Sequence, residues 1–423
     1  MQNANEIGFP NRVRFFGFSL FVSVYFLSFV QRVGISVIAN ELTVELGLDT
    51  VTLGFLSSGF LISYAIAQPA IGYLCDKVGP DRVGTVALII AATGSFMFAS
   101  AKGFSVAFLG RILMGAGLAA GFIPGMRTIA SMFPPKQLST YTALFITIGN
   151  IGTLVGAAPL AWLTATAGWR PIFTILAILA VLLVFACHIF SKQQSTGELP
   201  SPSPASNPAS YRTVIKNPGL WLIALFLFTK YGSQAAFQGL WAIPYISDVY
   251  DVGPILAAQT GTMIAVGYLI AGPFIGRFTD DMIHRGKNPF DARKWLLMVT
   301  SLLYFITWIP LVLIPGVIPF GGMYGALFVM GISASSASLA FSMANSLFPP
   351  KVAGLALGVI NIMSILGGAV LTPLIGWLIK HLEFRGLGGA GLYSRALIPC
   401  LIAAGLSTLF VIMMKKPSEE RGY

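Results

Sequence analysis

Long apolar stretches separated by short polar connections run along almost the whole chain. A helix needs roughly 20 apolar residues to cross about 30 Å of hydrocarbon, and each stretch has about that length. Splitting them at glycine, proline and charged residues predicts twelve membrane-spanning helices, at residues 15–38, 51–74, 83–101, 104–130, 139–164, 170–190, 219–247, 255–279, 294–314, 320–347, 352–379 and 394–414. The first stretch holds Gln31 and Arg32 in its middle. It is therefore not a cleaved signal peptide, whose apolar region is uninterrupted.

One polar stretch is much longer than the others. Residues 191–218 include Ser201-Pro202-Ser203-Pro204, a composition typical of a flexible linker. This linker separates an N-terminal bundle of six helices, residues 1–190, from a C-terminal bundle of six, residues 219–423. The expected fold class is an all-α integral membrane protein with two pseudo-symmetric six-helix bundles.

The two halves resemble each other in sequence. The features that recur in the same order are a Pro-x-x-Gly-x-x-x-Asp pattern (Pro69 to Asp76, and Pro273 to Asp280), a Phe-Pro-Pro-Lys run (133–136 and 348–351) and an asparagine (Asn150 and Asn361). Parallel repeats of six helices are typical of secondary transporters in which one half rocks against the other around a site near the membrane midplane.

Composition supports a membrane protein and gives its orientation. Of the 423 residues, 56% are hydrophobic and only 10% are charged, which excludes an ordinary soluble domain. The net charge is +11, and most of the 26 lysines and arginines lie in the termini, the linker and the other even-numbered loops. By the positive-inside rule, both termini are expected on the cytoplasmic side of the cytoplasmic (inner) membrane. The expected surroundings are membrane lipid, and the charge indicates orientation and not nucleic-acid binding.

Other classes of chemistry find no pattern in the sequence. The three histidines lie at the ends of spans or in loops, and none has a cysteine or acid at metal-ligand spacing. No Gly-rich loop ends in Lys-Ser or Lys-Thr, which argues against ATP as the energy source. We therefore expect no enzyme activity, no catalytic residue, no metal site and no cofactor, except for a coupling ion such as a proton or sodium.

Four bases but no acids lie well inside the predicted spans: Arg32, Arg111, Arg127 and Lys230. A charge at the centre of a bilayer costs about 2.5–3.5 kcal/mol or more, so it normally faces a cavity and has a function. The sequence predicts that Arg32 in span one and Lys230 in span seven occupy corresponding positions in the two halves. A guanidinium binds carboxylate or phosphate through two hydrogen bonds, and a lysine adds a compact second charge. Two such cations facing one cavity predict an anionic substrate. Snorkelling is the alternative for Lys230, which lies deep in its span.

Several further polar groups at mid-span depth are candidates for substrate contact. Arg111 is expected either to contact substrate or to hold the first span through its carbonyls and Gln31. The others have both a substrate-orienting and a helix-packing interpretation: Tyr64, Asn150, Asn361, Gln238 and Trp241. For Trp241 an anchor at the membrane interface is a further alternative.

The segment from Gly72 to Arg82, Gly-Tyr-Leu-Cys-Asp-Lys-Val-Gly-Pro-Asp-Arg, is the most specific local motif. It resembles the signature loop between the second and third spans of the major facilitator superfamily. The resemblance implies a twelve-helix transporter with a cytoplasmic latch between its halves. The residues implicated are Gly72, Asp76, Gly79 and Arg82, with Arg127 as the expected partner of Asp76 and Asp280 in the degenerate second copy. Helix capping and fixing of topology are the alternative roles.

Much of the N-terminal half is similar to the anion:cation symporter branch of that superfamily. The similar segments include Gln31 to Ala39, Glu45-Leu-Gly-Leu48, Arg111 to Lys136, Pro159 to Leu163 and Gly168-Trp-Arg170. The resemblance implies transport of organic anions such as sugar acids, dicarboxylates or phosphate-bearing compounds. The short run Lys230-Tyr-Gly232 also resembles organophosphate:phosphate antiporters.

The chain departs from that branch where its members usually carry protons. Gln31 stands in place of an acid before the first-span arginine, and Leu118 in place of an acid in the fourth span. The sequence therefore predicts a secondary transporter, functional as a monomer, that moves a small organic or phosphate-bearing anion by rocker-switch alternating access, through exchange or cation-coupled symport. The alternatives are a drug or cation exporter of the same fold and a transporter-like sensor.

Overall fold

A computed structural model describes residues 10–133, 138–194, 214–347 and 350–416, and these consist of helices joined by short connections, with no strand. Eleven of the described helices are long and apolar enough to cross a membrane. One further pair, Leu144–Val155 and Ala158–Ala167, is bent by 41° and makes a twelfth span if it is counted as one. The all-α membrane fold expected from the sequence is confirmed, and the chain is a multi-pass membrane protein.

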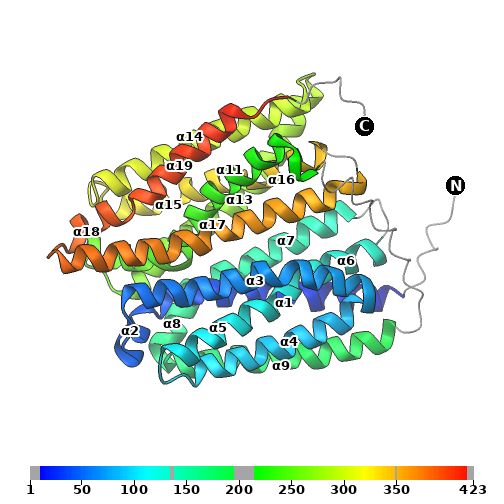
Figure 1. Ribbon diagram of the computed structural model, residues 1–423, viewed down its shortest axis with the longest axis horizontal. Coiled ribbons are helices and arrows are strands. Elements are labelled where there is room, and N and C mark those ends of the chain that lie inside the picture. The colour runs from blue at the N-terminus through cyan, green and yellow to red at the C-terminus, as the bar shows by residue number, and fades with distance from the viewer. Residues whose placement is uncertain (1–9, 134–137, 195–213, 348–349, 417–423) are drawn as a thin grey trace. The chain divides into compact units, whose positions relative to one another are not determined.

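The chain separates into two compact units, Met1–Pro204 and Ala205–Tyr423, and the division falls inside the polar stretch 191–218. Helices of the first unit run side by side along one common direction (Figure 1). They are α1 (Asn11–Val37), α2 (Ala39–Leu46), α3 (Thr50–Val78), α4 (Pro80–Ala99), α5 (Phe104–Leu118), the 3-10 turn η1 (Ala119–Gly121), α6 (Phe122–Met132), α7 (Leu138–Val155), α8 (Ala158–Ala167) and α9 (Trp169–Gln194). Within this unit α4 packs against both α5 and α9.

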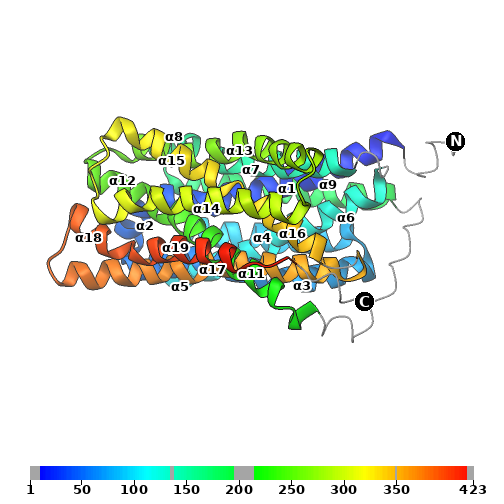
Figure 2. The ribbon, with the colours of Figure 1, turned by 90° about the horizontal axis from the view of Figure 1, so that it is seen from above.

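The helices of the second unit also share one direction among themselves (Figure 2). They are α11 (Pro218–Ala236), the π-helical turn η3 (Phe237–Trp241), α12 (Ala242–Tyr250), α13 (Pro254–His284), α14 (Pro289–Leu313), α15 (Phe320–Ala334), α16 (Ala337–Leu347), α17 (Pro350–Phe384), α18 (Gly389–Ala396) and α19 (Ile398–Met413). Here α11 packs against both α17 and α19.

Several of the described spans are interrupted, and three of these interruptions bear on the interior of the units. The fifth bends between α7 and α8, where Pro159 has no N–H to continue the helical hydrogen bonds. The fourth is interrupted by η1, and the tenth is interrupted at Ser335 and Ser336, between α15 and α16. The last two interruptions lie in corresponding spans of the two halves, and the second of them places two hydroxyl groups inside the second unit.

Close glycine contacts hold the spans of each unit together in the same pattern. In the first unit, a Cβ added to Gly152 of α7 would overlap the carbonyl oxygen of Phe26 on α1. In the second unit, a Cβ added to Gly367 of α17 would overlap the carbonyl oxygen of Phe228 on α11. Small residues at such crossings let two membrane helices approach until their backbones touch. The contact between spans one and five is therefore repeated between spans seven and eleven.

A second glycine contact is repeated in the same way. Gly115 of α5 lies against the carbonyl oxygen of Phe60 on α3, and Gly331 of α15 lies against that of Ile264 on α13. Spans two and four thus pack as spans eight and ten do. The internal repeat that the sequence motifs indicate is present in the helix packing of each unit.

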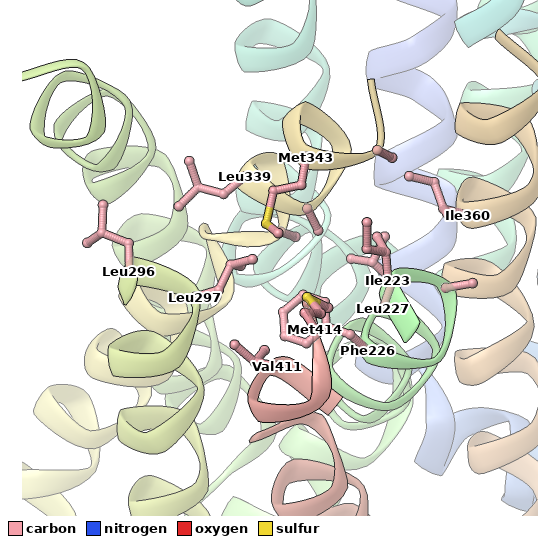
Figure 3. Close-up of a cluster of buried hydrophobic side chains, with 14 of the residues drawn as sticks. Ile223, Phe226, Leu227, Leu296, Leu297, Leu339, Met343, Ile360, Val411 and Met414 are labelled. Carbon is pink, nitrogen blue, oxygen red and sulfur yellow. The ribbon is translucent and has the colours of Figure 1, made fainter. Parts of the chain in front are cut away.

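The core of the second unit includes a cluster of apolar side chains from α11, α14, α16, α17 and α19 (Figure 3). Ile223, Phe226 and Leu227 belong to α11, and Leu296 and Leu297 belong to α14. On both of these helices the polar residues described below follow the cluster within about one turn. The cluster therefore closes one side of the polar group around Lys230.

Candidate functional site

Arg32 is a charged residue deep in the first span. Its side chain on α1 is half-buried. The guanidinium carbon lies 5.0 Å from the ring centroid of Tyr64 on α3 and 4.9 Å from that of Phe29. Guanidinium groups are attracted to aromatic faces within about 6 Å, most strongly where water is excluded. The two rings hold the guanidinium in place without neutralising its charge.

Arg111 on α5 is completely buried and ties two other helices together. Its Nη1 donates to the main-chain oxygen of Gln31 on α1 at 2.8 Å, and its Nε donates to that of Leu56 on α3 at 3.2 Å. Of the two roles expected from the sequence, the structure supports the one in which Arg111 holds the first span. The side chain of Gln31 contacts a further helix, because its Oε1 accepts from Ser95 on α4 at 3.2 Å.

A pair of aromatic rings lies beneath the two arginines. Phe60 and Tyr64, one turn apart on α3, have stacked rings with centroids 6.2 Å apart. The guanidinium carbon of Arg111 lies 4.6 Å from the Phe60 centroid, and that of Arg32 lies over Tyr64. We call these four residues the arginine–aromatic group. It combines two positive charges, one of them partly exposed, with no carboxylate among its members.

Lys230 of the second unit has different surroundings. Its side chain on α11 is 1% exposed. Nζ donates to the hydroxyl oxygens of Ser336 at 3.0 Å, Ser301 at 3.3 Å and Thr300 at 3.4 Å. The rings of Phe226 and Tyr304 lie 5.4 and 5.7 Å from Nζ. We call Lys230 and the three hydroxyl residues the lysine–hydroxyl group. In the part of the chain that the structure describes, no carboxylate lies within ion-pair distance of this ammonium.

The repeated glycine contacts correct one expectation from the sequence. They align Phe26 with Phe228, and therefore Arg32 with Gln234 and not with Lys230. Lys230 lies four residues earlier, about one helical turn, at the position equivalent to Ser28. The prediction that Arg32 and Lys230 occupy corresponding positions is therefore wrong by one helical turn.

Gln234, the true counterpart of Arg32, was missed by the sequence reasoning. Its Nε2 donates to Oε1 of Gln238 at 3.3 Å, across the start of the π-helical turn η3. Gln234 is buried, whereas Gln238 is half-buried. Single π-turns often occur at functional sites. Gln234 is identified when the two repeats are aligned by their helix-packing contacts and not by charge alone.

The remaining substrate candidates lie in less distinctive surroundings. Trp241 is 2% exposed, and its Nε1 donates to the carbonyl oxygen of Thr372 on α17 at 3.0 Å. It is a packing residue inside the second unit and not an anchor at the membrane interface. Asn150 is half-buried and donates to the carbonyl of Ile146 in its own helix at 2.8 Å. Asn361 is half-buried on α17.

The motif from Gly72 to Arg82 forms the junction of α3 and α4. Gly79 has φ +92°, a conformation that favours glycine, and it ends one helix and begins the next. At Gly72 an added Cβ would only reach van der Waals distance of Ile123, 3.9 Å away. Arg82 is exposed, as are Arg127 on α6 and Asp280 on α13. The side chain of Asp76 lies outside the described residues, and so do residues 134–137 and 348–349. The latch between Asp76 and Arg127 stays a prediction.

An acid that the sequence reasoning passed over is buried in this junction. Asp81, at the start of α4, is 7% exposed and accepts a hydrogen bond from the hydroxyl of Ser191 on α9. The thiol of Cys187 donates to the main-chain oxygen of the same residue at 3.1 Å. A carboxylate at a helix N-terminus is favourably placed in the field of the helix dipole. Asp81 therefore joins α4 to α9.

Comparison with known proteins gives one family. A model described as Major Facilitator Superfamily matches residues 21–289 and 228–422. The chain is 24% identical over 429 residues to GudP of Escherichia coli K12, described as a probable galactarate/D-glucarate transporter, with 93% of this chain and 91% of that protein covered. It is 23% identical over 394 residues to GarP of the same strain, which has the same description, with 84% and 86% covered.

A more similar but shorter match is to the nitrate/nitrite transporter NrtP of Picosynechococcus. It is 38% identical over 136 residues, and it covers 31% of this chain and only 25% of that protein. Among solved structures, a bacterial homologue of the human lysosomal transporter Spinster, in an inward-facing and occupied conformation, aligns with a TM-score of 0.74 at 16% identity, over 96% of this chain and 97% of that one. At this identity the match speaks for the fold alone.

Proposed function

Because this chain belongs to the major facilitator superfamily, and is therefore a membrane transporter and not an enzyme, we propose that it carries a small organic anion across the cytoplasmic membrane. The observation that carries the proposal is the arginine–aromatic group, in which two guanidiniums lie on stacked rings and one of them, Arg32, is partly exposed. A carboxylate or phosphate binds such buried or half-buried cations through strong charge-assisted hydrogen bonds.

The relatives agree with an anionic substrate. The long matches are to proteins described as galactarate/D-glucarate transporters, and shorter ones are to an L-galactonate transporter and a sulfoacetate transporter. Each of these compounds carries a carboxylate or sulfonate at neutral pH. The substrate we propose is a hydroxylated or short-chain carboxylate, with phosphate-bearing compounds as the next class.

In this proposal Arg32 binds the carboxylate and Tyr64 orients Arg32. Arg111 positions them both, since it links the main chains of α1 and α3 and lies over Phe60. The substrate moves by alternating access, through exchange or with a coupling cation. Both termini lie in the cytoplasm, in agreement with the distribution of lysine and arginine.

The test is an uptake screen with the purified protein in liposomes. Radiolabelled sugar acids, dicarboxylates, monocarboxylates, sugar phosphates and an organic cation are each offered with and without the same unlabelled compound inside. We expect counterflow for at least one carboxylate and none for the cation. Transport of the cation with no response to any anion would contradict the proposal and favour an exporter of the same fold.

A further inference from the structure

Lys230 is a buried charge that the proposed anion site does not use. Its ammonium has three N–H donors, and the structure gives it three acceptors, the hydroxyls of Thr300, Ser301 and Ser336. All three are neutral, and they come from α14 and from the interruption between α15 and α16. Charges in the interior are normally paired with an opposite charge or bound by a set of oxygens. Here it is the oxygens that bind the charge.

These hydroxyls belong to a network of hydrogen bonds that holds their oxygens around the ammonium. Thr300 also donates to Ser336 at 2.8 Å, and the Ser336 hydroxyl donates to the carbonyl of Ser333 at 2.9 Å. The hydroxyl hydrogens of Thr300 and Ser336 are thus used elsewhere, and lone pairs of these oxygens are left for the cation. The ring of Tyr304 lies 5.7 Å away on a further side, and its hydroxyl pairs with that of Ser233 at 2.9 Å. Hydroxyl oxygens and an aromatic ring therefore surround Nζ.

We propose that the lysine–hydroxyl group is a cation site occupied by a tethered ammonium, so that the carrier keeps its own positive charge in the second unit and moves its anion without an imported alkali cation. This inference rests on the proposed function. It selects exchange over cation-coupled symport, because a tethered charge stays in the protein when the anion leaves.

Replacing Lys230 with alanine makes the cation site available to an added ammonium ion. In Lys230→Ala the three hydroxyls lose their cation and leave space for a small ammonium ion. We expect methylammonium chloride to raise the thermal unfolding temperature of this variant by several degrees, since a ligand that binds only the folded state stabilises it. Tetramethylammonium chloride at equal concentration, which has no N–H donor, is expected to give no such rise.

Two proteins serve as controls for this measurement of unfolding temperature. The wild type already holds its ammonium, and Lys230→Met fills the same space with an apolar chain of similar length. Neither is expected to respond to methylammonium. An equal response of all three proteins, or no response of Lys230→Ala, would overturn the cation site. This arm needs no transport, so it gives an answer even if the proposed function fails.

The second arm uses the wild type alone and does not depend on whether Lys230→Ala folds. Uptake of the labelled anion is compared in sodium, potassium and N-methylglucamine buffers, into liposomes with and without the unlabelled anion inside and with a pH-sensitive dye enclosed. We expect rates equal within twofold and no internal acidification beyond that of protein-free liposomes. A tenfold loss without sodium, or one proton entering with each anion, would overturn the inference while leaving anion transport itself intact.

Discussion

The first unit holds its membrane-embedded arginines against aromatic rings, whereas the second holds its lysine among hydroxyl oxygens. The helix contacts beneath them are the same, since the glycines of spans five and eleven meet spans one and seven in the same way. A repeated scaffold therefore does not fix the chemistry that it carries. Arg32 is partly exposed, whereas Lys230 is enclosed.

The helix packing that the two units share depends on close glycine contacts. Substitution of these glycines is expected to have the largest effect. Gly152→Ala and Gly367→Ala each place a methyl group against a backbone carbonyl oxygen. Overpacking of this kind typically costs about 1–3 kcal/mol. We expect unfolding temperatures in detergent to fall by several degrees in both variants, by similar amounts, and Gly152→Leu and Gly367→Leu to yield no folded protein.

Gly239→Ala is the matched control, because Gly239 is buried in a helix of the second unit and has no atom within 4 Å of an added Cβ. Its unfolding temperature is expected to stay within a degree of the wild type. If Gly152→Ala and Gly367→Ala behaved like this control, the repeated contacts would not hold the spans of each unit together.

Arg111→Lys sharpens the division of roles inside the first unit. A lysine keeps the charge but cannot donate along the two fixed directions of the guanidinium fork to Gln31 and Leu56. Loss of a hydrogen bond from a charged donor costs about 1.5–3 kcal/mol. We expect a lower unfolding temperature, measured beside Arg285→Lys, an exposed control whose stability should be unchanged. An unaltered Arg111→Lys protein would show that the tether between α1 and α3 contributes little.

Tyr64→Phe and Tyr64→Leu sharpen the role of the ring under Arg32. Both remove the hydroxyl, but only leucine removes the aromatic face, whose attraction for the guanidinium amounts to about 0.5–2 kcal/mol. We expect KM for the transported anion to rise by roughly 2- to 30-fold in Tyr64→Leu relative to Tyr64→Phe. Equal KM values in the two variants would contradict the orienting role of the ring.

The fold could be predicted from the sequence because each span must be apolar over about 20 residues, and this leaves a pattern that needs no tertiary information. The bend of the fifth span had a local signal as well, in Pro159. The hydropathy of the sequence is therefore enough to predict the number and order of the membrane-spanning helices.

The surroundings of the charged groups could not be predicted in the same way. The hydroxyls that bind Lys230 lie 70, 71 and 106 residues away along the chain, and no local spacing connects them to it. Charge alone also aligned Lys230 with Arg32 in the internal repeat, whereas the glycine contacts align Arg32 with a residue one helical turn later. Register between repeats depends on packing, which the sequence motifs leave open by several residues.

In the proposed function, Arg32 is the residue that binds the anion. The most direct test is counterflow of the transported carboxylate by Arg32→Gln in liposomes, beside the wild type and Arg285→Gln, which replaces an exposed arginine that pairs with Asp281 at 2.7 Å. Loss of two hydrogen bonds to a charged donor predicts a decrease of at least tenfold in Arg32→Gln, with an unchanged unfolding temperature and normal rates in Arg285→Gln. Wild-type counterflow by a folded Arg32→Gln protein would contradict the account.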